Sequence, residues 1–491
     1  MKEKDNKNDV EKDIEKEITE VSVKKAKLWQ LGLFALNNSA TNAFHFFMTY
    51  IAYFASGVGG VAFVTASYVM TGMRVFDAFT DPVIGFLIDK LNLGKAGKFR
   101  PWMLLGNVLM TIALIILIFG MTSVPSSLSL LFFIVCYFIY ILGYTCQTAC
   151  TKAAQSCLTK DPKQRPLISM FDSLFSIMLM GGYGIYVTKF LIPKHGDYNE
   201  ALFNEFVVVA IVIAFICTIL AIISLWNEDV VAPSKKVKKE KIKMSEYVTI
   251  VKHNDALRKL MPAAALDKLA ALVANNPTTT LILFALIIGN YELSGMMTFF
   301  MLPPMIVIIS IGTKMCQKHG MRNVILFSKS ISVIMCSIMF FIMMFADISY
   351  IKEGGANIML YVFLFFYICE MALRSFCTST FTPMIADCID YEQSITGNEN
   401  PAMIGTMYSL VDKFVSSLSA TVAALAVAAV GFKEVAPSVN TELTTPLYIV
   451  GILLVLLLPI ISNAFTIVQM LMYPLSKEKM EEIQCKIKKE V

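Results

Sequence analysis

The sequence predicts an all-α polytopic membrane protein with twelve transmembrane helices. Its 491 residues are 56% hydrophobic and only 16% charged, and a water-soluble domain with that balance would expose a largely apolar surface. Apolar stretches of about 20 residues or more, long enough to cross a bilayer, recur along the chain. We expect the spans at residues 28–55, 62–88, 102–121, 128–152, 166–192, 204–226, 260–290, 294–313, 323–346, 357–382, 402–431 and 445–473.

Three prolines interrupt the seventh and eighth spans, so we expect breaks in those two helices. They are Pro277, Pro303 and Pro304. Breaks of this kind are tolerated in a membrane where the helix faces protein or a water-filled cavity.

The distribution of basic residues predicts the orientation. Lys and Arg precede the first span and lie in the turns after spans two, four and eight, whereas the turns after spans one, three and seven contain neither. Because cytoplasmic loops are enriched in Lys and Arg, we expect both termini to be cytoplasmic.

A basic stretch at residues 227–259 separates six spans from six. The predicted divisions are a cytoplasmic tail (1–27), an N-terminal six-helix bundle (28–226), this linker, a C-terminal six-helix bundle (260–474) and a second cytoplasmic tail (475–491). The linker is interpreted as a topological tether, with binding to anionic lipid headgroups as the alternative.

The two halves contain a faint repeat. Gly-rich basic turns of similar length join spans two and three in the first half and spans eight and nine in the second. Two six-span bundles in parallel repeat, with a site between them near the membrane midplane, are the layout of the major facilitator fold.

Three charged residues lie inside the second span. Arg74, Asp77 and Asp81 are three and four residues apart, so they share one stripe of a helix. A charged residue at mid-bilayer depth costs about 2.5–3.5 kcal/mol on insertion scales, so such residues usually face a bundle interior and serve an ion or substrate path. An ion pair between Arg74 and one aspartate would leave the other aspartate in need of a cation.

Three sequence motifs accompany these charges. They are R-x-x-D-A-x-x-D-P-x-x-G from Arg74 to Gly85, G-K-F-R-P-W from Gly97 to Trp102, and A-D-x-x-D-Y from Ala386 to Tyr391, the last expected between spans ten and eleven. Together with the twelve spans, they resemble the glycoside–pentoside–hexuronide:cation symporters, the family that contains the melibiose carrier. The resemblance runs over nearly the whole chain and implies cation-coupled symport by alternating access.

By this resemblance, Asp77, Thr80, Asp81 and Thr145 coordinate the coupling ion. Two carboxylates and two hydroxyls form an all-oxygen donor set suited to a hard cation, so Asp77 and Asp81 are also the predicted metal ligands. Carboxylates held this close also tend to retain a proton, so Na⁺ and H⁺ both remain open. No cofactor other than the coupling ion is expected.

The positions that bind sugar in the family carry different residues here. The acidic positions of spans one and four fall at Asn38 and Thr148, and the stacking aromatic position falls at Lys152. The lysine position of span eleven falls near Ser416, with Lys413 one turn earlier. The predicted substrate-binding residues are Asn38, Arg74, Thr148, Lys152 and Lys413.

Lys152 is the substrate candidate with the clearest chemistry. It lies on the same helix face as Thr145 and Thr148, and its ammonium indicates an anionic substrate. The alternative is a permanent ion pair with Asp172 or Asp412.

Other charges inside the spans have structural interpretations. Glu370 and Arg374 are four residues apart, which favours an ion pair within one helix. Asp267 and Lys268 lie near a helix end and are expected to reach the interface by snorkelling.

Lys98 and Arg100, in the turn between spans two and three, are predicted gating residues. Basic groups there can pair with acids at neighbouring helix ends and lock the outward-open state. Asp387 and Asp390 are their expected counterparts in the other half.

The sequence also argues against two other functional classes, nucleic-acid binding and enzymatic catalysis. The net charge of +5 is too small for a nucleic-acid partner, and neither a His cluster nor a motif such as H-E-x-x-H indicates an enzyme. The preferred function is symport of a small polar solute, by resemblance a glycoside, pentoside or hexuronide; a non-sugar organic anion or a lysolipid is the alternative. We expect a monomer in contact with membrane lipid, multi-pass in the plasma membrane, as in a bacterial inner membrane.

Overall fold

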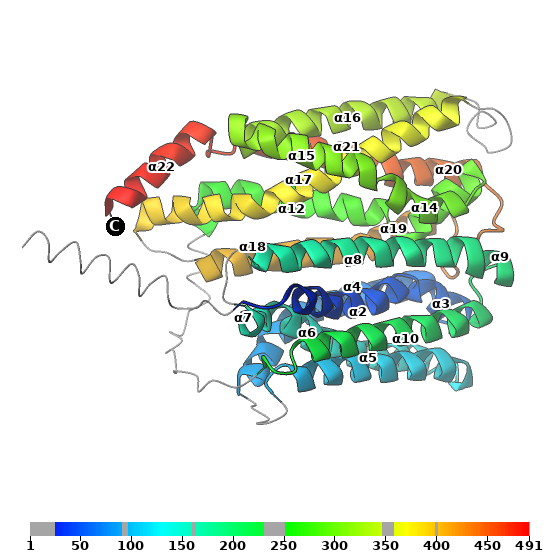
Figure 1. Cartoon of the computed structure of the whole chain (residues 1–491). Coiled ribbons are helices and arrows are strands. Elements are labelled where there is room, and N and C mark those ends of the chain that lie inside the picture. Colours follow the sequence, from blue (N-terminus) through cyan, green and yellow to red (C-terminus); the bar gives the residue numbers. More distant parts are fainter. Residues whose placement is uncertain are drawn as a thin grey trace, which may run out of the picture.

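The structure is a computed structural model in which two groups of long helices run side by side (Figure 1). The residues that it describes are 25–90, 97–159, 164–229, 251–345, 358–397 and 401–490. Most of the expected N-terminal tail and most of the linker, residues 230–250, lie outside this part of the chain.

The helices of the N-terminal half match the first six expected spans to within a few residues. They are α2 (Leu28–Thr49), α3 (Ile51–Gly57), α4 (Phe63–Lys90), α5 (Arg100–Gly120), the 3-10 turn η2 (Met121–Ser123), α6 (Ser129–Ala153), α7 (Gln155–Leu158), α8 (Arg165–Ile185), the π-helical segment η3 (Tyr186–Leu191), α9 (Ile192–His195) and α10 (Glu200–Ser224).

The C-terminal half follows the remaining six. Its helices are α12 (Asp255–Ala274), α13 (Pro277–Thr280), the π-helical segment η4 (Leu281–Ile288), α14 (Glu292–Phe300), α15 (Leu302–His319), α16 (Met321–Phe345), α17 (Ile358–Thr396), α18 (Pro401–Ser417), α19 (Ser419–Ala428), α20 (Thr445–Ile452), the π-helical segment η6 (Leu453–Leu457), α21 (Leu458–Leu471) and α22 (Lys477–Glu490).

The predicted proline breaks are present. The seventh span bends by 51° between α12 and α13, where Pro277 stands in the first turn and the Asn276 side chain accepts a hydrogen bond from the Thr278 amide. In the eighth span α14 ends at Phe300, and α15 starts with Pro303 in its first turn. Proline is favoured there because its missing N–H would have no helical partner.

Two elements differ from expectation at the end of the molecule where α22 lies. The tenth span was expected to end at residue 382, but α17 is 39 residues long, ends at Thr396 and carries the third motif on its last turns instead of in a loop. The C-terminal tail contains a packed helix, α22, which buries Met480 and Ile483 against the C-terminal half. Because α22 covers the end of α17, that helix can extend beyond the span.

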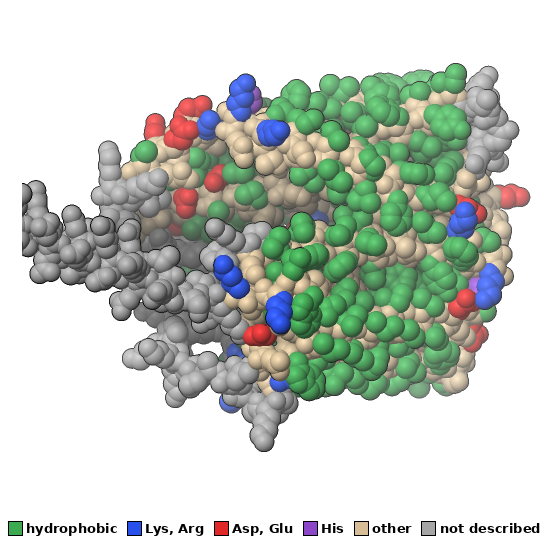
Figure 2. Space-filling model, in the orientation of Figure 1, with side chains coloured by type: hydrophobic (Ala, Val, Ile, Leu, Met, Phe, Trp, Pro, Cys, Tyr) green, Lys and Arg blue, Asp and Glu red, His purple; other side chains and the backbone are tan. Residues whose placement is uncertain are grey.

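Nine helices of the described residues are long and apolar enough to cross a membrane, and the bent pair α12 and α13–η4 makes ten. Exposed apolar side chains cover much of the face seen in Figure 2. The two expected spans outside this group are α2–α3 and α4, which carry polar and charged side chains along their length.

The apolar core differs between the two ends of the molecule. One large cluster joins both halves and includes Phe54 and Phe206 from the first and Phe284 from the second. Outside this shared cluster the core separates into clusters confined to one half each, around Trp102 in the first half and around Tyr473 and Phe376 in the second. Figure 2 shows a hollow between the halves at the end where α22 lies. The halves are therefore closely packed at one end and separated at the other.

Polar contacts reinforce the closed end. The Tyr53 hydroxyl donates to Thr278 Oγ1 at 3.2 Å, and the hydroxyls of Tyr198 and Tyr291 lie 2.6 Å apart. Burial raises the pKa of Tyr198 and of Tyr291 well above the ordinary value, so both phenols stay neutral. Both contacts link a residue of the N-terminal half to a residue of the C-terminal half.

Candidate functional site

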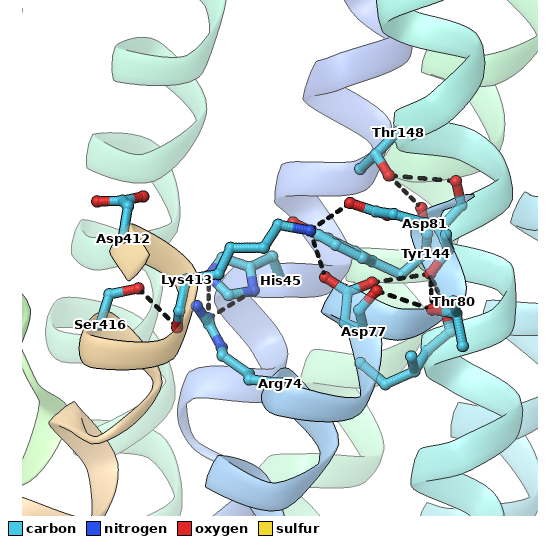
Figure 3. A network of polar contacts seen from close by, with 12 residues as sticks. His45, Arg74, Asp77, Thr80, Asp81, Tyr144, Thr148, Asp412, Lys413 and Ser416 are labelled. Carbon is cyan, nitrogen blue, oxygen red and sulfur yellow. Dashed lines mark hydrogen bonds and ion pairs between the residues drawn. The ribbon is translucent and has the colours of Figure 1, made fainter. Parts of the chain in front are cut away.

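Three of the four residues predicted to bind the coupling ion are in direct contact. Thr145 Oγ1 on α6 donates to Asp77 Oδ1 on α4 at 2.8 Å, and it lies 3.1 Å from Thr80 Oγ1 (Figure 3). Asp77, Thr80 and Thr145 are all buried. Asp77 and Thr80 are three residues apart on α4, so both side chains lie on the face of that helix that contacts Thr145 of α6.

The fourth residue, Asp81, is joined to the cluster by Lys413 of α18. The Lys413 ammonium lies 3.2 Å from Asp77 Oδ2 and also pairs with Asp81 Oδ2. Lys413 was predicted to bind substrate; in this structure it pairs with the two aspartates and lines a cavity, and its contact with substrate stays a prediction. The donor set fits a small hard cation in its chemistry, and in this conformation the ammonium satisfies the same carboxylates.

Arg74 does not pair with either aspartate. Its guanidinium donates to the imidazole of His45 on α2, with 2.8 Å to Nε2. An ion pair between Arg74 and an aspartate, one arrangement that the sequence allowed, is not formed, because Lys413, which is far away in sequence, reaches both carboxylates from the other half.

Two cavities are lined by residues of both halves, and Asp77 and Lys413 of the ion cluster line the smaller one. The smaller, about 150 Å³, is lined by His45, Arg74, Asp77, Tyr137, Tyr140, Ile141, Tyr144, Lys268, Lys413 and Ser416. The larger, about 450 Å³, is lined by aromatic rings, methionines and hydroxyl side chains, together with Arg374, from α2, α8, η3, α12, α13, η4, α14 and α17 and the turns beside them. His45 lines the first cavity and its neighbour Phe46 the second, so α2 contributes to both.

Among the described residues, the other predicted substrate residues make no hydrogen bond to the side chains of Asp77, Thr80, Asp81 and Thr145. Asn38 Nδ2 donates to Asp172 Oδ1 at 2.7 Å, and the Thr148 hydroxyl donates to the Tyr144 carbonyl of its own helix at 3.0 Å. Lys152 is exposed and has no ion-pair partner within the described ranges. Its alternative role as a permanent ion pair is wrong, because Asn38 holds Asp172 and Lys268 holds Asp412.

The remaining intramembrane charges form three pairs in the C-terminal half. Glu370 and Arg374 make the expected ion pair on α17. Asp267 and Lys268 do not snorkel: Asp267 is buried and pairs with Lys329 of α16, while Lys268 pairs with Asp412 of α18.

Lys329 is the charged residue that the sequence interpretation missed. It is fully buried, and its ammonium also donates to Asn463 Oδ1 at 3.1 Å. Its position inside the ninth expected span was the available signal, because an isolated lysine at that depth requires a buried partner.

The predicted gating residues lie at the end where the halves are separated. The carboxylate of Asp229, just after α10, accepts hydrogen bonds from the backbone amides of Lys98, Phe99 and Arg100 at 2.8–3.0 Å. Arg100 Nε lies 3.6 Å from the same carboxylate. This contact is within the N-terminal half, and pairing across the halves with Asp387 and Asp390 on α17 stays a prediction for a conformation closed at this end.

The chain belongs to the family described as MFS/sugar transport protein, which it matches over residues 33–477. It is accordingly a multi-pass membrane transporter and not an enzyme. This agrees with the resemblance to the glycoside–pentoside–hexuronide:cation symporters.

Curated relatives are distant but extensive. The chain is 23% identical over 389 residues to an uncharacterized symporter, YjmB, of Bacillus subtilis, covering 78% of this chain and 79% of the relative. It is 22% identical over 430 residues to a lactose permease of Leuconostoc lactis, covering 82% of this chain and 63% of that longer protein.

Solved structures support the fold alone. The nucleoside transporter NupG aligns with a TM-score of 0.53 at 13% identity, covering 91% of this chain and 99% of that one. A variant of the fucose:proton symporter of E. coli aligns with a TM-score of 0.50 at 14% identity, covering 91% of this chain and 98% of that one.

Proposed function

We propose that this protein is a cation-coupled secondary symporter of a small polar solute, with sugars and glycosides as the first class to test. The relatives that carry a functional name support this class, because they are a lactose permease and symporters. The proposal includes twelve membrane crossings in two six-helix bundles, cytoplasmic termini, and a monomer in a bacterial inner membrane. The end with α22 and the basic turns is then cytoplasmic, and the conformation is open to the cytoplasm.

The observation that carries the proposal is the contact of Lys413 with Asp77 and Asp81. The carboxylates and the hydroxyls of Thr80 and Thr145 belong to the N-terminal half, whereas the ammonium belongs to the C-terminal half. A coupling cation competes with this ammonium for the same oxygens. Cation binding therefore changes a contact between the two halves, which is what coupling of an ion to alternating access requires.

The solute has a candidate cavity between the halves, one residue along α2 from His45. The cavity of about 450 Å³ is lined by aromatic rings, several methionines and hydroxyls and Arg374, so it offers both apolar and polar contacts to a sugar ring with its apolar face and polar edge. We propose that this cavity holds the solute and that His45 and Phe46, which are neighbours on α2, connect it to the cation cluster.

The test is solute uptake into proteoliposomes against an imposed Na⁺ or H⁺ gradient, with a panel of mono- and disaccharides. Asp77→Asn and Asp81→Asn should each abolish cation-driven accumulation while the protein still inserts and unfolds at a normal temperature. Glu200→Gln, which removes an exposed acid at the far end, is the matched control and should transport normally. Full accumulation in both aspartate variants would show that Asp77 and Asp81 do not form the coupling site.

A further inference from the structure

The ion pair between Lys268 of α12 and Asp412 of α18 lies beside the cation cluster but does not belong to it. Lys268 lines the smaller cavity together with Lys413, which follows Asp412 on α18. In Figure 3 the Asp412 carboxylate points away from the Lys413 ammonium, which reaches Asp77 and Asp81 instead. One cavity is therefore bordered by two lysines, and different carboxylates hold each of them.

The two members of the Lys268–Asp412 pair differ in their access to water. The side chain of Lys268 is 41% exposed, whereas that of Asp412 is 17% exposed. Breaking an ion pair costs little where the ammonium becomes hydrated, and much where a charge is left buried without a partner. Lys268 can therefore leave Asp412 for water, but Asp412 then requires another counter-charge.

The Lys413 ammonium is the counter-charge closest at hand. A coupling cation takes the oxygens of Asp77 and Asp81 that hold this ammonium, so cation binding leaves Lys413 without a carboxylate. An unpaired charge between membrane-spanning helices is strongly unfavourable. Asp412 is the adjacent residue on the same helix, and the flexible four-carbon stem of a lysine lets its ammonium turn from one carboxylate to another.

The charges around the smaller cavity support this exchange. Without a cation, three positive groups face three negative ones: Arg74, Lys268 and Lys413 against Asp77, Asp81 and Asp412. A bound Na⁺, or a proton on one carboxylate, adds one positive charge. When Lys268 moves into water, the charges that stay enclosed balance again, because the cation has replaced its ammonium.

We propose that Asp412 receives Lys413 when a cation binds, and that Lys268 leaves Asp412 at the same time. This inference rests on the proposed symport function and makes Lys268 and Asp412 positioning residues, which act on the cation site through Lys413. One carboxylate of the C-terminal half exchanges one lysine for another while the cation enters the N-terminal half. The contact of Lys413 with the other half is thus broken without leaving a buried charge unpaired.

Cation affinity without solute, measured by thermal stabilisation with Na⁺ and with Li⁺, should respond in opposite directions to the two partners. Asp412→Asn should weaken binding about tenfold or more, because the displaced Lys413 finds no carboxylate. Lys268→Met should strengthen binding several-fold, because Asp412 is already free to receive Lys413. A purely structural ion pair would lower the melting temperature in both variants and leave cation affinity unchanged, which would overturn the inference.

A change of net charge alone would also act in opposite directions, so both substitutions are repeated together with Lys413→Met. No ammonium has to be displaced in that background, and neither Asp412→Asn nor Lys268→Met should then change cation affinity by more than about twofold. Effects of full size in that background would overturn the exchange. The exposed pair Asp255–Arg258 on α12 is the matched control, and Asp255→Asn and Arg258→Met should leave cation affinity unchanged in both backgrounds.

Chemical labelling of Lys268 tests the exchange in the protein without substitutions. Acetic anhydride should acetylate Lys268 several-fold faster at saturating Na⁺ or Li⁺, because its amino group is no longer held by Asp412. The exposed Lys433 is the internal reference and should be labelled equally with and without the cation. Unchanged labelling of Lys268 in protein that binds the cation would overturn the inference, whether or not the Asp412 variant folds.

Failure of the proposed symport would look different. If solutes are taken up without dependence on Na⁺, Li⁺ or H⁺ gradients, symport fails and this inference fails with it. If Asp77→Asn abolishes cation binding but Asp412→Asn and Lys268→Met do not change it, symport stands and the exchange at Asp412 is overturned. If H⁺ is the cation bound, the same variants are compared by the pH midpoint of proton uptake, where a tenfold change is about one pH unit.

Discussion

Lys413 of α18 and Asp81 of α4 form an ion pair that joins the two halves of the protein beside its central cavities. The lysine is half-buried and also lies 3.2 Å from Asp77. Two carboxylates that share one ammonium are left with a net negative charge. This arrangement is stable without a bound cation but can still attract one.

Lys413→Met should increase cation affinity several-fold, because the carboxylates lose the ammonium that competes with the cation. We expect coupled accumulation to fall at the same time, since the contact that changes between the halves is gone. Cation-dependent thermal stabilisation and uptake measure the two effects. Lys433→Met, at an exposed lysine, is the control. Weaker cation binding in Lys413→Met would contradict the proposed competition between the Lys413 ammonium and the cation.

Gly295→Ala should prevent full closure of the end opposite α22. A Cβ at Gly295 on α14 would lie 2.6 Å from the carbonyl group of Gly184 on α8, so the two halves must separate. Overpacking costs about 1–3 kcal/mol, enough to shift a conformational equilibrium about tenfold. Hydrogen exchange should accelerate in peptides around Tyr198 and Tyr291.

Gly182→Ala is the matched control for this change, because a Cβ at Gly182 meets no atom within 4 Å. Equal exchange in the two alanine variants would show that the close glycine contact does not determine closure.

Asp229→Ala should destabilise the N-terminal half. The Asp229 carboxylate is buried and accepts three backbone amides of the turn before α5, and the loss would leave those donors without partners. We expect a loss of about 1–3 kcal/mol of unfolding free energy and a lower melting temperature in detergent. Glu442→Ala, at an exposed acid, should have little effect. An unchanged melting temperature would mean that water replaces the carboxylate.

Lys329→Met should be strongly destabilising, because it leaves the buried Asp267 carboxylate without its counter-charge. Breaking a buried pair costs about 3–5 kcal/mol, whereas replacing both members is often nearly neutral. Lys329→Met combined with Asp267→Asn should therefore recover most of the stability. Thermal unfolding of the two single variants and the double variant forms the cycle. Additive losses would show that the pair is not coupled.

Most of the fold follows from apolar segments and prolines, since the twelve expected spans coincide with helical segments and Pro277 marks a real break. The extension of α17 to Thr396 was not predictable from hydropathy. Its last turns are polar, and they are helical because α22, which follows much later in the chain, packs against them.

The candidate site was predictable within α4 and α6 but not across the halves. Helical spacing and the family motif bring Asp77, Thr80 and Thr145 together. The partners that decide the charge of the site, Lys413 for the aspartates and His45 for Arg74, come from other helices. Periodicity describes one helix at a time, so it carries no information about such pairings.

The polarity of α2 and α4 has a consequence for the biogenesis of the protein. These helices carry the site, and neither is among those apolar enough to cross a membrane unaided. Each packs against α6, and α6 is apolar enough to insert by itself. We therefore expect the translocation machinery to retain α2 and α4 until α6 has been synthesised, so that the polar path is assembled during insertion and is never exposed to lipid.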